Sequence, residues 1–285
     1  MKNYTKHLLL LAGLALIAGS SAFAQQFQGI ATYQSSRKMD GFNIKMDGMA
    51  PEMQDKIKAQ LQKQFQKEYS LKFNLTESVW KEVESLEGGP ATASGNGVMI
   101  RMSTGGGVTY KNTAENLYIQ ENEVFSKPFL VKDELEPREW KITDETKKIG
   151  NYNALKAILT DIRESRSISF TSDSENKSDS AKSEIKVDTV HIEAWFTTEI
   201  PVSQGPDEFW GLPGLILELK NGSVTYLCTQ VVLNPAEGVE IKQPSKGKEV
   251  TREELRKEID LKTEEMQKKF SNERGGNVHI KIGGN

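Results

Sequence analysis

The chain has little of what builds metal centres and disulfides, with one cysteine and three histidines in 285 residues. A single cysteine cannot form a disulfide within the chain. His7 lies in the leader segment described below, and neither His191 nor His279 has a second ligand at helical or hairpin spacing. Zinc and copper sites are built from such companions. The sequence therefore predicts no metal site and no cofactor.

Familiar catalytic motifs are missing too. There is no G-x-S-x-G elbow, P-loop, G-x-G-x-x-G or H-E-x-x-H, the spacings that carry nucleophilic, phosphate-binding and zinc chemistry. The Gly triplet at 105–107 lacks the Lys-Ser/Thr of a phosphate loop, and the acids at 133–136 lack EF-hand spacing. A carboxylate pair acting on a polysaccharide stays open, but nothing singles one out. We therefore expect a protein that is not an enzyme.

Only the first residues contain a long apolar run. Lys2 and Lys6 precede an apolar segment at 8–18, and Ala22-Phe23-Ala24 forms a cleavage site. This pattern predicts a secretory signal peptide at 1–24, with the mature chain starting at Gln25. No later run is long enough to span a bilayer, so we expect an exported chain that does not span a membrane after cleavage. A net charge of −3 gives no support to nucleic-acid binding.

Short segments with alternating apolar residues dominate the rest of the chain. Tyr69, Leu71, Phe73 and Leu75, for example, alternate with polar residues, as in a half-buried strand. We expect a mainly β domain at 25–249. Its fold is predicted to be antiparallel, either a strongly curved sheet or a partly open barrel, with two amphipathic helices.

The first helix is predicted at about 51–67, as an insertion in the β domain. Pro51 suits a first helical position, and Met53, Ile57, Leu61 and Phe65 recur every four residues, which gives one apolar stripe. An ordinary helix packed on the sheet is the simpler interpretation. A Met-bearing lid or partner-binding helix is the alternative.

The second helix opens the segment at 250–285. Thr251 and Glu254 have the spacing of a capping box, and Leu255, Ile259, Met266 and Phe270 fall on one helical face. A Gly-rich tail at 275–285 encloses Val278-His279-Ile280-Lys281-Ile282. This short alternating stretch either stays disordered or adds to a sheet edge in this protein or in a partner.

The stretch Trp210-Gly211-Leu212-Pro213-Gly214-Leu215-Ile216-Leu217 combines a turn with a buried strand. Pro213-Gly214 predicts a type II turn, and Asn221-Gly222 predicts a type I′ hairpin turn. With that two-residue loop, Leu219 would face Val224, Leu217 would face Tyr226 and Leu215 would face Cys228 on a single core face. Cys228 is therefore expected to be a buried small apolar residue rather than a reactive thiol.

A resemblance to a known family rests on this stretch and its surroundings. The segment from Ala194 to Pro201, then Gly205-Pro206, Phe209 and 211–217, is similar to the signature of the GLPGLI family of Gram-negative envelope proteins. Upstream matches are Trp140, Glu145-Thr146-Lys147, Ile149-Gly150, Tyr152 and Lys156-Ala157. The resemblance implies an uncharacterised secreted or envelope protein associated with TonB-dependent outer-membrane transport. It supplies no catalytic residues.

One departure from the family pattern concerns a disulfide. Relatives have a cysteine where this chain has Ala154 and a second where it has Cys228, which implies a bridge between two strands. Here Cys228 has lost that partner. The loss of such a bridge removes about 2–4 kcal/mol of stability.

Aromatic residues suggest a candidate binding surface. The loop from Ile200 to Trp210 holds two prolines and two aromatics, so it is expected to be fixed. One interpretation is that it borders a ligand groove or partner surface; the other, which we favour, is that its aromatics plug the end of the core. The residues of this candidate surface are Trp195, Phe196, Phe209, Trp210, Leu212 and Pro213.

A polar segment at 171–183 is predicted to be an exposed, mobile loop. Asp179-Ser180-Ala181, and Asp188-Thr189-Val190 nearby, match an Asp-Ser/Thr-aliphatic acceptor pattern for O-glycosylation in some Gram-negative bacteria. Ser180 and Thr189 are therefore candidate sites, with Thr189 expected to start a strand.

Three functions follow as hypotheses. The first is a non-enzymatic accessory or binding module of the periplasm or cell envelope, with an outer-membrane transporter or other envelope protein as its partner. The second is a periplasmic carrier of a lipid or other apolar small molecule, which needs a dry cavity behind the 200–217 loop. The third is a hydrolase.

Overall fold

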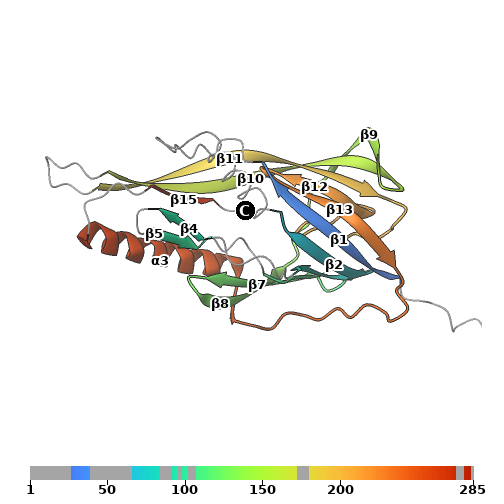
Figure 1. Ribbon diagram of the computed structural model, residues 1–285, viewed down its shortest axis with the longest axis horizontal. Helices are drawn as coiled ribbons and strands as arrows, with labels where there is room; N and C mark the ends of the chain where they lie inside the picture. Colours follow the sequence, from blue (N-terminus) through green and yellow to red (C-terminus); the bar gives the residue numbers. More distant parts are fainter. Residues whose placement is uncertain are drawn as a thin grey trace, which may run out of the picture.

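Thirteen strands form one large sheet in the computed structural model of the chain (Figure 1). The structure describes residues 27–38, 66–83, 92–95, 98–101, 107–171, 180–273 and 279–283. The predicted signal peptide at 1–24 lies outside these residues. So does nearly all of the helix predicted at about 51–67.

The strands are β1 (Gln28–Arg37), β2 (Glu68–Asn74), β3 (Glu77–Glu82), β6 (Thr109–Asn112), β7 (Leu117–Val124), β8 (Lys127–Glu134), β9 (Lys141–Ile149), β10 (Tyr152–Thr171), β11 (Ser180–Thr197), β12 (Leu215–Asn221), β13 (Val224–Leu233), β14 (Lys248–Val250) and β15 (His279–Gly283). A separate hairpin consists of β4 (Thr92–Gly95) and β5 (Val98–Arg101). The prediction of a mainly β fold is confirmed.

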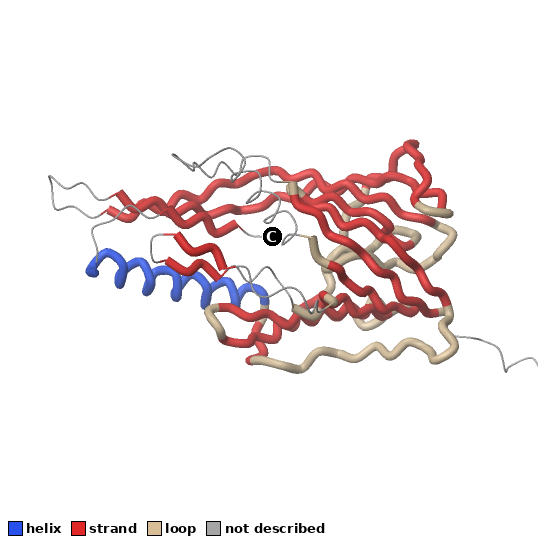
Figure 2. The backbone as a smooth tube through the Cα atoms, in the orientation of Figure 1, coloured by secondary structure: helices blue, strands red, loops and turns tan. Residues whose placement is uncertain are grey.

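The strand path is open. It runs β14-β8-β7-β6-β3-β2-β1-β13-β12-β11-β10-β15, with β9 paired to β10, and it does not return on itself. All pairs are antiparallel except β14 with β8. Figure 2 shows the sheet bending through β1 and β13, so that β7 and β8 lie on one side of the view and β10 and β11 on the other. The sheet is open and is not closed into a barrel, which agrees with either predicted shape, a strongly curved sheet or a partly open barrel.

Alternating side chains build the first core cluster on the inner face. Ala31 and Tyr33 of β1, three residues of β2, Trp80, and Leu215 and Leu217 of β12 are buried together. Tyr69 stacks on Trp80 with ring centroids 4.8 Å apart, an arrangement that adds to simple area burial. Leu75 was predicted to continue this face, but β2 ends at Asn74 and Leu75 is 55% exposed at the turn.

A second cluster lies where β10, β11 and β12 meet, and it includes Ala157, Ile192, Phe196 and Leu219. A third lies between β7, β8 and the helix α3 (Arg252–Glu273), and it includes Tyr118, Phe129 and Leu255. Residues from the segment at 198–214, between β11 and β12, enter the first two clusters. We call this segment the central loop.

The capping box of α3 is confirmed. The Thr251 amide donates to the Glu254 carboxylate at 2.9 Å, and the Glu254 amide donates to the Thr251 hydroxyl at 3.1 Å. These bonds satisfy backbone donors that the first helical turn leaves unpaired. Among the described residues α3 is the only helix, so two helices are not seen there.

The hairpin register differs from the prediction by two residues. Asn221 pairs with Val224 and Leu219 with Tyr226, so the turn is Gly222-Ser223 and not Asn221-Gly222. Gly222 has a φ of 58°, and a glycine at the first central position is typical of a type II′ turn. Because side chains alternate with period two, a shift of two residues does not by itself move a side chain to the other face. The three leucines nevertheless do not share one cluster. Leu215 and Leu217 lie in the first core cluster and Leu219 in the second, and the pairing of β12 with β11 has a register irregularity between them.

Two further sequence predictions are corrected, and one of the alternatives for the tail is confirmed. The sequence also predicts a short strand at 239–241, but none forms there. The last strand before α3 is β14, which pairs in parallel with β8. The loop predicted at 171–183 is shorter, because β10 runs to Thr171 and β11 begins at Ser180. Of the alternatives left open for the tail stretch, the structure shows addition to a sheet edge of the same chain, because residues 279–283 form β15 on the edge of β10.

Candidate functional site

The central loop runs through the interior of the curved sheet. Its side chains at Ile200, Val202, Gln204, Phe209 and Leu212 are at most 1% exposed. Backbone bonds tie it to β12, since the amides of Leu215 and Ile216 donate to the carbonyls of Ile200 and Gln204. The expectation that this loop is fixed therefore has a structural cause: it is packed and hydrogen-bonded as core.

Lys111 of β6 also binds the central loop, through hydrogen bonds to its backbone. Its side chain is fully buried, and its ammonium donates to the backbone carbonyls of Gly205, Asp207 and Phe209 at 2.8, 2.5 and 3.0 Å. Burial lowers the pKa of Lys111 to about 7, although the charges of Asp207 and Glu208 act in the opposite direction. An ammonium has three donors, and each of them is used here on loop backbone.

Asp207 lies beside this lysine at a strained point of the loop. Its φ is 49°, a left-handed conformation that few non-glycine residues adopt. Its carboxylate accepts a hydrogen bond from the Thr109 hydroxyl at 2.9 Å. Burial, and then the neighbouring charge of Glu208, raise the pKa of Asp207, while the Thr109 bond and Lys111 counter that rise.

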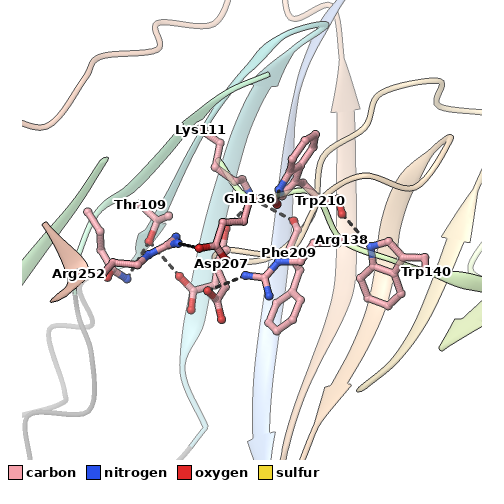
Figure 3. A network of polar contacts seen from close by, with 11 residues as sticks. Thr109, Lys111, Glu136, Arg138, Trp140, Asp207, Phe209, Trp210 and Arg252 are labelled. Atoms are coloured by element: carbon pink, nitrogen blue, oxygen red, sulfur yellow. Dashed lines mark hydrogen bonds and ion pairs between the residues drawn. The ribbon is translucent and has the colours of Figure 1, made fainter. Parts of the chain in front are cut away.

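Figure 3 shows how the segment 136–140 meets this part of the loop. Arg138 forms an ion pair with Glu208 at 2.8 Å and lies 5.5 Å from the centre of the Phe209 ring. Trp140 donates its indole N–H to the Trp210 carbonyl at 2.8 Å, and Trp210 donates to the Glu136 carbonyl at 3.2 Å. Two indole hydrogen bonds therefore join the two segments, one donated from the segment 136–140 to the loop and one donated from the loop to that segment.

Glycines allow the loop to approach the sheet closely. A Cβ on Gly214 would lie 2.1 Å from the Thr197 carbonyl oxygen, and one on Gly205 would lie 2.6 Å from Ile216 Cδ1. Gly211, not Gly214, has a positive φ, of 99°. The predicted type II turn at 212–215 is therefore wrong, because that turn needs a positive φ at Gly214.

The six predicted surface residues lie in four different places. Phe196, Phe209 and Leu212 lie in the second core cluster. Trp210 is half-buried against the third cluster, and Pro213 is exposed. Trp195 points to the opposite face of β11 from Phe196, because side chains alternate along a strand.

On that outer face Trp195 is covered by lysines and is only 7% exposed. Lys147 lies 4.2 Å and Lys156 lies 5.7 Å from the Trp195 ring centre. Lys156 also pairs with Glu145 at 3.0 Å and Glu193 at 3.3 Å, and the hydrogen bond that it donates to the Glu145 carboxylate is the main reason that its pKa is raised. The structure therefore does not bring Trp195 together with the loop aromatics.

Cys228 is half-buried against the first core cluster. Burial raises the pKa of its thiol to about 12, so the thiol stays protonated at neutral pH. Ala154 lies in β10, and β11 and β12 separate β10 from the strand of Cys228.

The two candidate glycosylation positions both lie in β11. Ser180 is its first residue. Thr189 does not start a strand; it is an exposed residue within β11, opposite Ile162. Modification of either residue stays a prediction.

The described residues contain no group of three or more His, Cys, Asp or Glu side chains placed to hold a metal ion. They also contain no helix long and apolar enough to cross a membrane.

Lys111 is the site residue that sequence reasoning missed. It lies in a four-residue strand whose residues are all buried, Thr109-Tyr110-Lys111-Asn112, so alternation gave no indication of its role. Its partners are backbone carbonyls 94 to 98 residues further along the chain. No side-chain motif marks such partners.

Comparison with known proteins gives distant likenesses. No curated protein matches the chain. Two solved structures of PNGF-II, in the P21 and C2 space groups, are 19% identical over 82% of this chain, with a TM-score of 0.44. This chain spans about a third of their length, 33% and 32%, and a likeness at this level carries no argument about fold or activity. Residues 140–218, which hold most of the positions behind the sequence resemblance, match the family described as "Protein of unknown function (Porph_ging)".

Proposed function

We propose that the chain is a non-enzymatic, exported protein of the Gram-negative cell envelope, of the GLPGLI type. In this proposal it is an accessory or binding module that works beside an outer-membrane transporter of the TonB-dependent class. The predicted signal peptide and the sequence resemblance support the location. The match of residues 140–218 to a family of unknown function is in keeping with the resemblance.

The use of Lys111 is the observation that carries the non-enzymatic part of the proposal. Buried lysines with a lowered pKa are candidates for catalysis, because the neutral amine is a nucleophile or base. Here the three donors of the ammonium are bonded to three loop carbonyls. The group therefore has a structural task, which is to fix the shape of the central loop.

A fixed loop presents a fixed surface. Trp140 and Trp210 are half-buried, Gly211 and Pro213 are exposed, and the two indole bonds hold these residues in place. Pre-organised surfaces bind with less loss of conformational entropy. We take these four residues as the rim that contacts the partner.

The carrier alternative finds no specific support. It needs a cavity behind the 200–217 segment, and that space holds buried side chains of the loop packed against the sheet. Gly205 approaches Ile216 so closely that even a methyl group would clash. We therefore keep the binding module as the single proposed function.

Cross-linking in the native host tests the proposal. The full chain would be cross-linked in the envelope, purified, and its covalently captured proteins identified by mass spectrometry. Pro213→Glu should abolish recovery of an outer-membrane transporter, because it places a charge on the rim. Pro128→Glu, at an exposed proline of β8, is the matched control and should leave recovery unchanged. No transporter with the unaltered chain, or equal recovery with both variants, would contradict the proposal.

A further inference from the structure

Among the described strands, β15 stands at one end of the strand path, where it occupies part of the outer edge of β10. Within the part of the chain that the structure describes, β15 pairs with β10 alone, as His279–Gly283 against Ser165–Ser169 in one antiparallel ladder. β9 covers a different stretch of the same edge, Tyr152–Ile158. The edge of β10 at 165–169 thus accepts a short strand that arrives from elsewhere in the chain.

The C-terminal segment links the two ends of the open strand path. α3 packs on β8 and β14 at one end, through Leu255 and Val250 and through the Arg252 amide, which donates to Asp133 at 3.1 Å. β15 then pairs with β10 at the other end. Figure 1 shows α3 and β15 on the same side of the molecule. No other strand depends on β15 for a partner, so it can leave without breaking another described ladder.

The sequence of β15 shows what this edge accepts. It reads His-Ile-Lys-Ile-Gly, so apolar and polar residues alternate, and Ile280 lies opposite Ile168 in the register. Strand addition obtains affinity from main-chain hydrogen bonds and selectivity from alternate side chains. A strand held by one short ladder is the kind of element that another strand can replace, because unpaired edges are templates for pairing.

We propose that the edge of β10 at Ser165–Ser169 is a strand-addition site for an extended peptide segment of a partner, with alternating aliphatic residues. β15 is its internal occupant and competes with the partner segment. This inference rests on the proposed function, because it names how the binding module would engage its envelope partner.

The test uses the full chain and a labelled peptide. The peptide has the sequence of residues 277–285, Asn-Val-His-Ile-Lys-Ile-Gly-Gly-Asn, and its binding is measured by fluorescence anisotropy. Ile280→Pro in the protein should free the edge, since proline cannot donate to a ladder. Ile280→Val should keep it occupied, and Ile282→Pro provides a second release variant if the first folds poorly.

We expect the peptide to bind the release variant at least ~10-fold more tightly than the unaltered chain, because the tethered strand competes at a high effective concentration. Bound peptide should slow amide exchange at 165–169. A peptide with proline at both isoleucine positions should not bind. Equal binding to all variants, no binding to either release variant, or protection confined to other residues would each overturn the proposal.

The outcomes separate this site from the proposed function. Peptide binding at 165–169 without any captured transporter would keep the strand-addition site and remove the transporter partner. Transporter capture that is equal for the unaltered chain and the release variants, with no peptide binding, would keep the function and remove this site. A dimer in which copies exchange β15 would show the same edge filled by a second copy, and would replace the partner in the proposal.

Discussion

Trp140 donates its indole N–H to the backbone carbonyl of Trp210, 70 residues away, at 2.8 Å. Trp210 returns a bond to the segment that precedes Trp140, at the Glu136 carbonyl. Each indole thus donates to a backbone carbonyl that lies outside the β-strands and has no partner in a β-ladder. The pair joins an irregular segment between β8 and β9 to the central loop.

Removal of one indole donor should loosen this junction. Trp140→Phe keeps a ring in place but leaves the Trp210 carbonyl without its donor, and we expect a loss of about 1 kcal/mol of stability. Trp210→Phe should cost less, because its bond is longer and exposed to water. Urea unfolding measures both losses, and amide exchange at 207–213 should rise in Trp140→Phe. Unchanged exchange there would show that the bond does not hold the loop.

Lys111→Met tests whether the buried ammonium is structural. The substitution keeps an unbranched apolar side chain, one atom shorter. It leaves three carbonyls without donors and removes the positive charge of Lys111 that acts on Asp207, so we expect a loss of about 3 kcal/mol. Lys132→Met, at an exposed lysine of β8, is the control and should change stability by less than ~0.5 kcal/mol. Equal effects of the two variants in urea unfolding would remove Lys111 from its assigned role.

Alanine substitutions at two glycines should destabilise the fold by very different amounts. Gly214→Ala places a methyl 2.1 Å from the Thr197 carbonyl oxygen, and backbone must move to admit it, so we expect a loss of at least ~3 kcal/mol. Gly222→Ala meets no atom within 4 Å and should cost only about 1 kcal/mol for its left-handed φ. Thermal unfolding of both variants measures the difference. A milder effect at Gly214 than at Gly222 would contradict the close packing of the central loop.

Alkaline pH should weaken the fold through buried tyrosines. Burial, and then the nearby Cys228, raise the pKa of Tyr33 well above its usual value, and its hydroxyl donates to the Ile216 carbonyl at 2.6 Å. Above about pH 10 the unfolded chain loses this proton while the folded chain keeps it, so unfolding is favoured by about 1.4 kcal/mol per pH unit. Below that pH this contribution is constant.

Tyr33→Phe isolates this effect. At about pH 8 the variant should be less stable than the unaltered chain by about 1 kcal/mol, the usual net value of one hydrogen bond. The difference should shrink as the pH rises above about 10, because only the unaltered chain gains from ionisation on unfolding. Urea unfolding across this range is the measurement. A stability difference that stays constant with pH would show that Tyr33 titrates alike in both states.

Local patterns in the sequence predicted many elements correctly. The alternating residues from Tyr69 to Phe73 lie in a strand, β2, and the reciprocal bonds of Thr251 and Glu254 form as the capping box requires. Both depend on contacts within a few residues. The hairpin after β12 was also found, but its turn lies one residue later, since Gly222 alone supplies the left-handed conformation.

The sequence by itself thus determined the strand pattern, the cap of α3 and the apolar faces, because these follow from alternation and short-range bonds. Only the tertiary structure decided the roles of Lys111, Gly214 and β14. Lys111 bonds to carbonyls from a distant segment, Gly214 approaches the backbone of β11, and β14 pairs in parallel with a strand more than a hundred residues earlier. Contacts to backbone atoms leave no pattern of side chains in the sequence. They form only when the sheet curves around the central loop and brings these distant segments together.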